Sequence, residues 1–288
     1  MKKIILLLPA YNDWESLIKV LDEVNSIIQK IKNYEFSCLI VNDCSSVENP
    51  KIIKPKNFNS LKIVNMKKNK GHARCNAFGL RYINLNEKYD YVIVMDSDGE
   101  DRPVEINSLI KKISEEPATS VVAKRIKRSE GPIFQTLYRT HKLITFIFTG
   151  KKINFGNYSC LTKKDVNILS DKASLWSSFS GSVKKNLASL NEVDSIRGPR
   201  YFGPSKMSFF NLAIHSFSII AVFKYTVFLR STFMIIILSF LTKALGLFAI
   251  FFQVLIVFFN LLIFIVSMRE NKEALIKSNE NILDEITH

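Results

Sequence analysis

The chain has 288 residues, 47% of them hydrophobic, and a formal net charge of +14 at pH 7. This length and composition exclude a disordered chain and favour one main domain with at most a small appendage. The basic excess suits an anionic membrane face or phosphorylated substrates, and a long apolar run near the C-terminus favours these partners over nucleic acid.

From residue 3 to about residue 126, short apolar runs alternate with segments of helical periodicity. This alternation predicts the α/β class, with parallel strands joined by crossover helices. The expected strands are Lys3–Leu8, Phe36–Asp43, Leu61–Met66, Tyr91–Asp96 and Ser120–Ile126. Further helices are expected near Gly71–Leu85 and Val104–Glu116.

An amphipathic helix is expected between the first two strands, because apolar residues from Trp14 to Ile28 recur at helical spacing. Asn12 is predicted to cap its N-terminus, with Glu15 three residues later as the partner in a capping box.

Polar residues follow the carboxyl ends of the predicted strands, which is where open parallel sheets bind ligands. The first strand is followed by Pro9, Ala10, Tyr11 and Asn12, the second by Asp43, and the fourth by Asp96 and Asp98. Each residue alone has a structural explanation as a helix cap or a turn. Their convergence on one edge of the sheet favours a binding site.

The segment "YVIVMDSDGED" (Tyr91–Asp101) ends a predicted strand with closely spaced carboxylates. The four acidic residues are Asp96, Asp98, Glu100 and Asp101. Carboxylates at i and i+2 across a turn can present oxygen to one Mg²⁺ or Mn²⁺, which would stabilise the charge of a departing diphosphate. A solvated acidic turn before a helix that begins near Pro103 explains the same residues, and both readings stay open.

The ordered series "LPAYND", "LIVNDCSS", "NKGHARCNAFG", "VIVMDSDGEDRPVE" and "VVAKRIKR" resembles the family 2 glycosyltransferases of GT-A fold over about the first 130 residues. The resemblance implies a Rossmann-like mixed sheet, a nucleotide-sugar donor and Mg²⁺ or Mn²⁺. It implies that the base and ribose of the donor bind at Pro9, Ala10, Tyr11, Asn12 and Asp43, and that Gly71 lets the backbone approach the donor closely. The ribose or sugar would lie near Asp96, and the diphosphate near Arg125. It implies metal ligands at Asp98, with Asp96 and Glu100 beside it.

Two later segments, "INFGNYSCLTKKDV" (Ile153–Val166) and "RGPRYFGPSKMSFFNLAIHSFS" (Arg197–Ser218), precede a hydrophobic tail. They are similar to membrane-attached transferases related to dolichyl-phosphate mannose synthase and to bacterial polyprenyl-phosphate glycosyltransferases. The resemblance makes Arg197, Arg200 and Lys206 ligands of a lipid phosphate or of the donor diphosphate. A basic collar that touches anionic lipid headgroups is an equal alternative.

Asn157 stands where many relatives have an Asp that is a candidate base, and an amide cannot accept the proton. A lipid phosphate is already anionic at neutral pH and mainly needs orientation, so Asn157 fits a phosphate acceptor better than a hydroxyl. A base at Glu100, Asp101 or Asp165 stays open, and the expected catalytic residues are Asp98, Asp101 and Asn157. Residues 135–140, "QTLYRT", lack the QxxRW motif of processive synthases, which favours transfer of a single sugar.

The run Ser231–Met268 contains one charged residue, Lys243, and about 20 apolar residues cross a bilayer core. It is expected to form one tilted helix or, as the resemblance favours, two helices that bend near Gly246. The expected division is a transferase domain (1–205), an interfacial helix (206–230), a membrane segment (231–268) and a tail (269–288) that forms a frayed helix. A second interfacial or domain-packing helix is expected at 132–148.

These features lead to one hypothesis: a membrane-anchored inverting glycosyltransferase on the cytoplasmic face. It would move one sugar from a nucleotide sugar to undecaprenyl or dolichyl phosphate for cell-surface glycan assembly. The alternatives are transfer to a hydroxyl of a lipid-linked glycan and a non-catalytic nucleotide-sugar-binding membrane subunit. No nucleic-acid partner is expected, and a homo-oligomer stays open.

Overall fold

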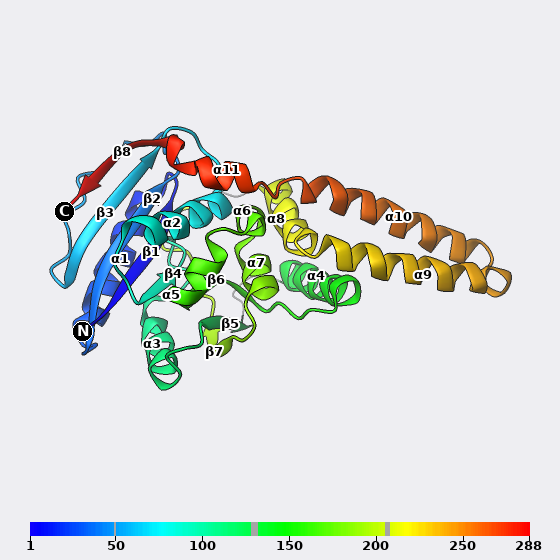
Figure 1. Cartoon of the computed structure of the whole chain (residues 1–288), viewed down its shortest axis with the longest axis horizontal. Coiled ribbons are helices and arrows are strands. Elements are labelled where there is room, and N and C mark those ends of the chain that lie inside the picture. The colour runs from blue at the N-terminus through cyan, green and yellow to red at the C-terminus, as the bar shows by residue number, and fades with distance from the viewer. Residues whose placement is uncertain (49, 128–131, 205–207) are drawn as a thin grey trace.

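Figure 1 shows the computed structural model, which describes residues 1–48, 50–127, 132–204 and 208–288. Both termini lie in an α/β part, and a hairpin of two long helices projects from its side. Lys206, predicted to bind phosphate, lies outside the described residues.

The sheet of the described residues has the strand order β7-β5-β6-β4-β1-β2-β3-β8. β1 pairs in parallel with β2 and β4, β2 with β3, and β5 with β7. β6 is antiparallel to β4 and β5, and β8 is antiparallel to β3, so the predicted mixed α/β sheet is confirmed. The strands are β1 Lys2–Ala10, β2 Tyr34–Asn42, β3 Phe58–Met66, β4 Tyr91–Val94, β5 Val121–Lys127, β6 Phe155–Thr162, β7 Asn191–Ile196 and β8 Ile282–Thr287.

Helices cover both faces of this sheet, as the continuous apolar sequence of β1 predicts. Ile4, Leu6 and Leu8 of β1 pack under α1 and α3, while Ile5 and Leu7 join the core under α2 and α5 to α7. The helices are α1 Trp14–Ile28, α2 His72–Asn86, α3 Ile106–Glu115, α4 Pro132–Thr149, α5 Lys163–Leu169, α6 Ala173–Ser177, α7 Phe179–Asn186, α8 Phe209–Ala221, α9 Lys224–Leu245, α10 Leu247–Ser267 and α11 Lys272–Ile276, with 3-10 turns η1 Pro103–Glu105 and η2 Lys277–Asn281.

The predicted capping box at the start of α1 is wrong. The N-cap residue is Asp13, and its side chain makes no capping hydrogen bond. Asn12 has a φ of 51°, a left-handed conformation that asparagine tolerates better than most residues. Its Nδ2 donates to Ser46 Oγ at 3.0 Å, and its Oδ1 accepts from the backbone N of Val47 at 3.0 Å. Asn12 therefore joins the loop after β1 to the loop after β2 instead of capping the helix.

The apolar run forms two antiparallel helices, α9 and α10, that meet at Gly246, whose φ is 57°. Both are long and apolar enough to cross a membrane, and only 11% and 22% of their most apolar windows is buried. Lys243 lies in the last turn of α9, next to the bend. The segment expected to form one interfacial helix up to residue 230 is divided between two helices. Helix α8 ends at Ala221, and α9 begins at Lys224.

The tail does not form a frayed helix as predicted. After the hairpin the chain returns through α11 and η2 and adds β8 to the edge of the sheet beside β3, as Figure 1 shows. Leu61 and His288 exchange backbone hydrogen bonds of 3.1 and 2.9 Å. An edge strand has unpaired N–H and C=O groups, and pairing with β8 satisfies those of β3.

Candidate active site

The loops that follow β1, β2 and β4 are tied together, as the position of their polar residues at one sheet edge predicts. Ser97 Oγ donates to the carbonyl of Pro9 at 2.6 Å. The backbone N of Asp43 donates to the carbonyl of Ala10 at 2.9 Å. Tyr11 at this edge is 40% exposed, which leaves its ring open to a ligand.

Asp43 is buried and holds the loop that precedes α2. Its two carboxylate oxygens accept from the backbone N of Lys70 at 2.8 Å and of Gly71 at 2.7 Å. Gly71 has a φ of 91°, and a Cβ added to it would meet nothing within 4 Å. The space beside Gly71 is therefore open, which is consistent with the predicted close approach of a ligand to its backbone.

A cluster of Asp96, His72 and Asn157 joins the end of β4 to α2 and β6. His72 Nε2 and Asn157 Nδ2 each lie 3.1 Å from Asp96 Oδ1, and 2.7 Å separates these two nitrogens. Burial opposes the charged form of His72, but the charge of Asp96 raises the pKa of the imidazole. Burial also opposes the charge of Asp96, but His72 and Arg125 lower the pKa of this carboxyl.

His72 was not among the residues predicted to form the site. The available signal was its position directly after Gly71, at the start of a predicted helix that leaves the same sheet edge. Only the fold shows that this edge also carries Asp96 and Asn157.

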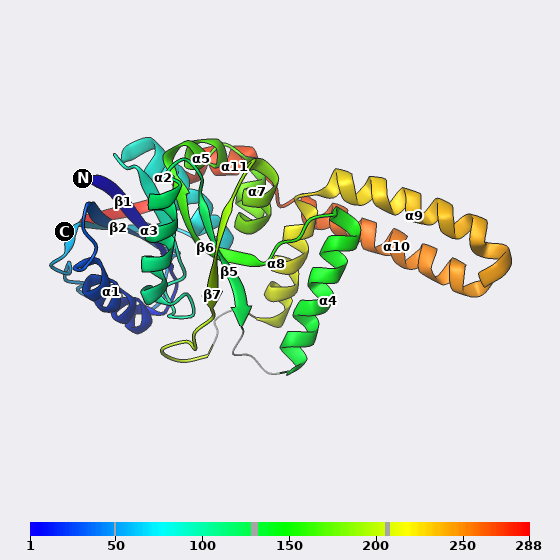
Figure 2. The same cartoon turned by 90° about the horizontal axis from the view of Figure 1, so that it is seen from below.

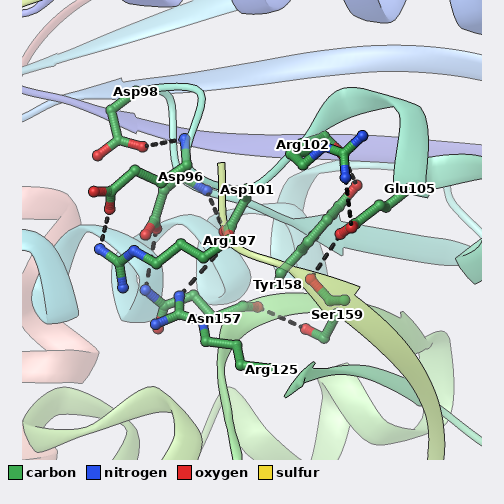
Figure 3. Close-up of polar contacts among 12 residues, drawn as sticks. Asp96, Asp98, Asp101, Arg102, Glu105, Arg125, Asn157, Tyr158, Ser159 and Arg197 are labelled. Carbon is green, nitrogen blue, oxygen red and sulfur yellow. Dashed lines mark hydrogen bonds and ion pairs between the residues drawn. The ribbon is translucent and has the colours of Figure 1, made fainter. Parts of the chain in front are cut away.

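Asp98 and Asp101 lie at the same turn with a surplus of negative charge (Figure 3). Burial, with the charges of Asp96 and Glu100, raises the pKa of Asp98 to about 6. Burial, with the charge of Asp96, raises the pKa of Asp101 to about 7, although Arg125 Nη2 lies 3.5 Å from its Oδ1. The turn therefore favours additional positive charge.

The segment that follows β7 covers this acidic turn and supplies two arginines. Arg200 Nη1 lies 2.6 Å from Asp98 Oδ2, and its Nη2 pairs with Asp13. Arg197 pairs with Glu100. The backbone N of Tyr201 donates to the carbonyl of Asp98 at 3.0 Å. Two of the three predicted phosphate ligands are thus brought to the predicted metal ligands.

The donor chemistry of the turn fits a cation that is shared with a phosphorylated ligand. Among the described residues, no group of three or more His, Cys, Asp or Glu side chains is arranged to hold a metal ion. Mg²⁺ commonly takes one or two carboxylates and completes its shell with substrate phosphates and water. The raised pKa values of Asp98 and Asp101 indicate carboxylates that a cation would stabilise. Asp96, Asp98 and Glu100 stay predicted ligands.

Asp165, an open candidate for the base, lies at the opposite edge of the sheet. It is in the first turn of α5, directly after β6, whose Thr162 pairs with Tyr91 at the amino end of β4. Its Oδ2 accepts from Ser120 Oγ at 2.5 Å. Asp165 therefore stabilises the start of α5 by binding Ser120, and it lies too far from the turn after β4 to act there as a base.

Gly99→Ala is expected to lower the free energy of unfolding by about 2 kcal/mol, because its φ is +89° and the new Cβ would lie 2.7 Å from the ring of Tyr201. Gly203→Ala is the matched control, since Gly203 has a φ of +61° and open space around it. Urea unfolding of both variants measures the difference. Equal losses would show that Tyr201 does not pack on the acidic turn.

The ligand-free protein is expected to have a lower Tm at pH 8 than at pH 5. The folded-state pKa values of Asp98 and Asp101, about 6 and 7, exceed their ordinary value of 3.8, so the folded protein binds more protons in this range and loses stability as the pH rises. The raised pKa of His72 acts in the same direction. Asp101→Asn should flatten the dependence, whereas Asp171→Asn at an exposed site should not. A Tm that rises from pH 5 to pH 8 would contradict this account.

Comparisons with known proteins identify the family and the fold of the chain. Residues 5–177, more than half of the chain, match the family described as "Glycosyl transferase family 2". An uncharacterized protein of Methanocaldococcus jannaschii is 26% identical over 124 residues, 42% of this chain, and the chain spans about half, 51%, of that relative's length.

Among solved structures, glucosyl-3-phosphoglycerate synthase from Mycobacterium tuberculosis, in complex with Mn²⁺, UDP-glucose and phosphoglyceric acid, has a TM-score of 0.56 at 14% identity. The match covers 78% of this chain and 80% of that chain. The same synthase in complex with UDP has a TM-score of 0.55 at 15% identity, with the same coverage. At this level of identity, the likeness shows the shared fold.

Proposed function

Because the chain belongs to glycosyltransferase family 2, we propose that it transfers a single sugar, with inversion, from a nucleotide sugar to a polyprenyl phosphate at a membrane surface. The observation that carries the proposal is the path of the chain at the acidic turn. Arg197 and Arg200 cover Asp98 and Glu100, and the same segment leads to α8 and then to the exposed apolar hairpin. A site for phosphates is thus continuous with a surface for lipid.

The position of α8 supports this arrangement, and Figure 2 shows α8 between the sheet and the hairpin. Burial and the nearby charge of His72 lower the pKa of His215, in α8, to about 4. A helix that adjoins the base of the hairpin therefore reaches the neighbourhood of the Asp96 cluster. An acceptor held in the membrane could present its phosphate to the site along α8.

In the proposed reaction an oxygen of the acceptor phosphate attacks the anomeric carbon of the donor sugar. The bond from this carbon to the nucleoside diphosphate breaks, and the diphosphate leaves with the electron pair. The phosphates of donor and acceptor would be neutralised by Arg125, Arg197 and Arg200. In the ligand-bound protein, phosphate oxygens would replace the carboxylates that now pair with these arginines. Mg²⁺ or Mn²⁺ at the acidic turn would act as a Lewis acid on the leaving diphosphate.

Asn157 would position groups rather than move a proton, because its amide is held between Asp96 and His72. This suits an acceptor that is already anionic. Transfer to a hydroxyl of a lipid-linked glycan is a second candidate, and the raised pKa of Asp101 favours it. A carboxyl with a pKa of about 7 is suited to general-base catalysis at neutral pH.

The apolar hairpin is proposed to anchor the protein with the transferase domain on the cytoplasmic face. The 21 residues of α10, none of them charged, extend about 32 Å, which is enough for a hydrocarbon core of about 30 Å. Lys243 at the tip would reach the far interface by extending its side chain. Lys151, Lys152 and Arg230 lie at the other end of the hairpin, and Arg230 Nη1 donates to the carbonyl of Ile147 at 3.0 Å. Basic residues at this end favour the cytoplasmic side.

Transfer to lipid tests the proposal directly. Detergent-purified protein would be incubated with Mg²⁺ or Mn²⁺, a panel of radiolabelled nucleotide sugars and undecaprenyl or dolichyl phosphate, and then extracted with organic solvent. Label in the organic phase that is lost with a chelator is the expected result. Donor binding without any label in lipid would contradict the phosphate acceptor and favour the glycan hydroxyl.

A further inference from the structure

We propose that the chain after the hairpin acts as a strap that positions the donor-binding loop, with Asn281 and Asp284 as positioning residues. The strap consists of Asn281–His288, and the loop is Lys67–Gly71. The inference rests on the proposed function, because it assumes that Asp43 and Gly71 contribute to the nucleotide-sugar site.

The strap contacts the loop directly through two hydrogen bonds of Asn281, and the preceding residue, Glu280, adds a third. The backbone N of Lys67 donates to the carbonyl of Asn281 at 2.7 Å, and Asn281 Nδ2 donates to the carbonyl of Lys68 at 3.0 Å. Lys67 Nζ also donates to the carbonyl of Glu280 at 3.0 Å. Asn281 therefore holds the start of the loop from both its backbone and its side chain.

Two other side chains reach the backbone of the loop: Cys44 Sγ donates to the carbonyl of Lys67 at 3.4 Å, and Arg74 Nη1 donates to the carbonyl of Lys70 at 2.9 Å. Residues 67–70 are all exposed, so packing contributes little to their position. The other end of the loop is held by Asp43, which accepts from the backbone N of Lys70 and of Gly71. A short exposed segment held at both ends by hydrogen bonds should loosen when one end is released.

A second route leads from the strap to the site through a chain of amide side chains. Asn65 Nδ2 donates to Asp284 Oδ1 at 2.5 Å, and Asn42 Nδ2 donates to Asn65 Oδ1 at 2.8 Å. Asn42 Oδ1 accepts from the backbone N of Ser45 at 3.1 Å, and Ser45 Oγ accepts from the backbone N of Asn12 at 2.9 Å. This series of hydrogen bonds thus connects β8, β3 and β2 to the loop after β1.

The two routes end on different parts of the predicted donor site. Asn281 reaches the loop that Asp43 binds, and Asp284 reaches Asn12 at the end of β1. Because the strap follows the apolar hairpin in sequence, the donor site is complete only when the chain has returned from the hairpin to the sheet edge. The strap touches no reacting group, and its effect should fall on donor binding rather than on the chemical step.

The test uses the full-length protein in detergent with four variants. Asn281→Ala removes the side-chain bond to Lys68, and Asp284→Ala removes the acceptor of Asn65. Asp284→Asn keeps an oxygen that can accept this bond and serves as the conservative rescue. Lys277→Ala is the matched control, because Lys277 pairs with Glu273 at 2.7 Å within the same tail segment and lies outside the strap. The readouts are amide hydrogen exchange of residues 67–71 and the Kd for UDP and for GDP with Mn²⁺.

Asn281→Ala should accelerate exchange in residues 67–71 and raise the nucleotide Kd by about fivefold to tenfold, with kcat for transfer unchanged. Asp284→Ala should raise the Kd while Asp284→Asn and Lys277→Ala match the wild type. Unchanged exchange in Asn281→Ala, or faster exchange with unchanged nucleotide affinity, overturns the strap alone. A wild-type protein that binds no nucleotide overturns the proposed function and the inference with it, even where the exchange result shows that the strap orders the loop.

Discussion

Asp98→Ala is expected to lower the rate of sugar transfer by about 10²-fold to 10³-fold, the range typical for loss of one electrostatic group that stabilises a leaving group. Asp98 lies at the centre of the acidic turn and contacts Arg200 at 2.6 Å. Burial and its acidic neighbours raise its pKa, so a bound cation would stabilise this carboxylate. Removing it should weaken both the metal site and the position of Arg200.

Single-turnover transfer with saturating donor measures this loss separately from donor binding. The fold should survive, because Arg200 keeps its pair with Asp13, and a Tm within a few degrees of the wild type would confirm this. Asp171→Ala is the control, since Asp171 is an exposed carboxylate that pairs with Arg81 away from the turn. Transfer by Asp98→Ala at the wild-type rate would rule out the metal assignment.

The part of the site that could be predicted from the sequence depends on short-range rules. A parallel strand brings its carboxyl end to a known edge, so the residues after β1, β2 and β4 could be placed together without knowing any contact. Hydrophobic length likewise predicted one tilted apolar helix or two, and the resemblance favoured two helices with a bend near Gly246. The ordered motifs added the family, which the match over residues 5–177 shows.

What the sequence could not predict depends on contacts between distant segments. His72 gains its role only from Asp96 and Asn157, which lie on other elements. Asn12 looked like a helix cap because local pattern cannot show that Ser46 and Val47 would be its partners. The tail was misjudged for the same reason: Ile282–Thr287 is short and rich in charge, and its pairing with β3 spans more than two hundred residues.

The pairing of β8 with β3 changes how the membrane anchor should be tested. Ending the chain at Arg230 would remove the hairpin together with the strap. It would leave the edge of β3 unpaired and the loop Lys67–Gly71 without Asn281. We expect this truncated protein to be destabilised and prone to aggregation through its free edge, so its failure to stay in solution would say nothing about a membrane.

Internal excision separates the two effects. Deleting Thr232–Phe258 and joining the ends with a few glycines should move the protein from the membrane fraction to the soluble fraction, because most of the exposed apolar surface of the hairpin is removed. The deletion keeps the packed base of the hairpin, including Val227, Ile263 and Val266, and the pair of Lys224 Nζ with Glu270 Oε2 at 3.3 Å. The domain and its strap should therefore stay folded.

Sedimentation after cell lysis and the Kd for nucleotide measure the two properties of the excised protein. A soluble protein with wild-type nucleotide affinity is expected, since α11 and β8 still reach the sheet edge. If the excised protein remains with the membrane, α4 and α8 suffice as an anchor and the hairpin serves another purpose. If it is soluble and folded but has lost its affinity for nucleotide, the return of the tail does not suffice to support the donor site.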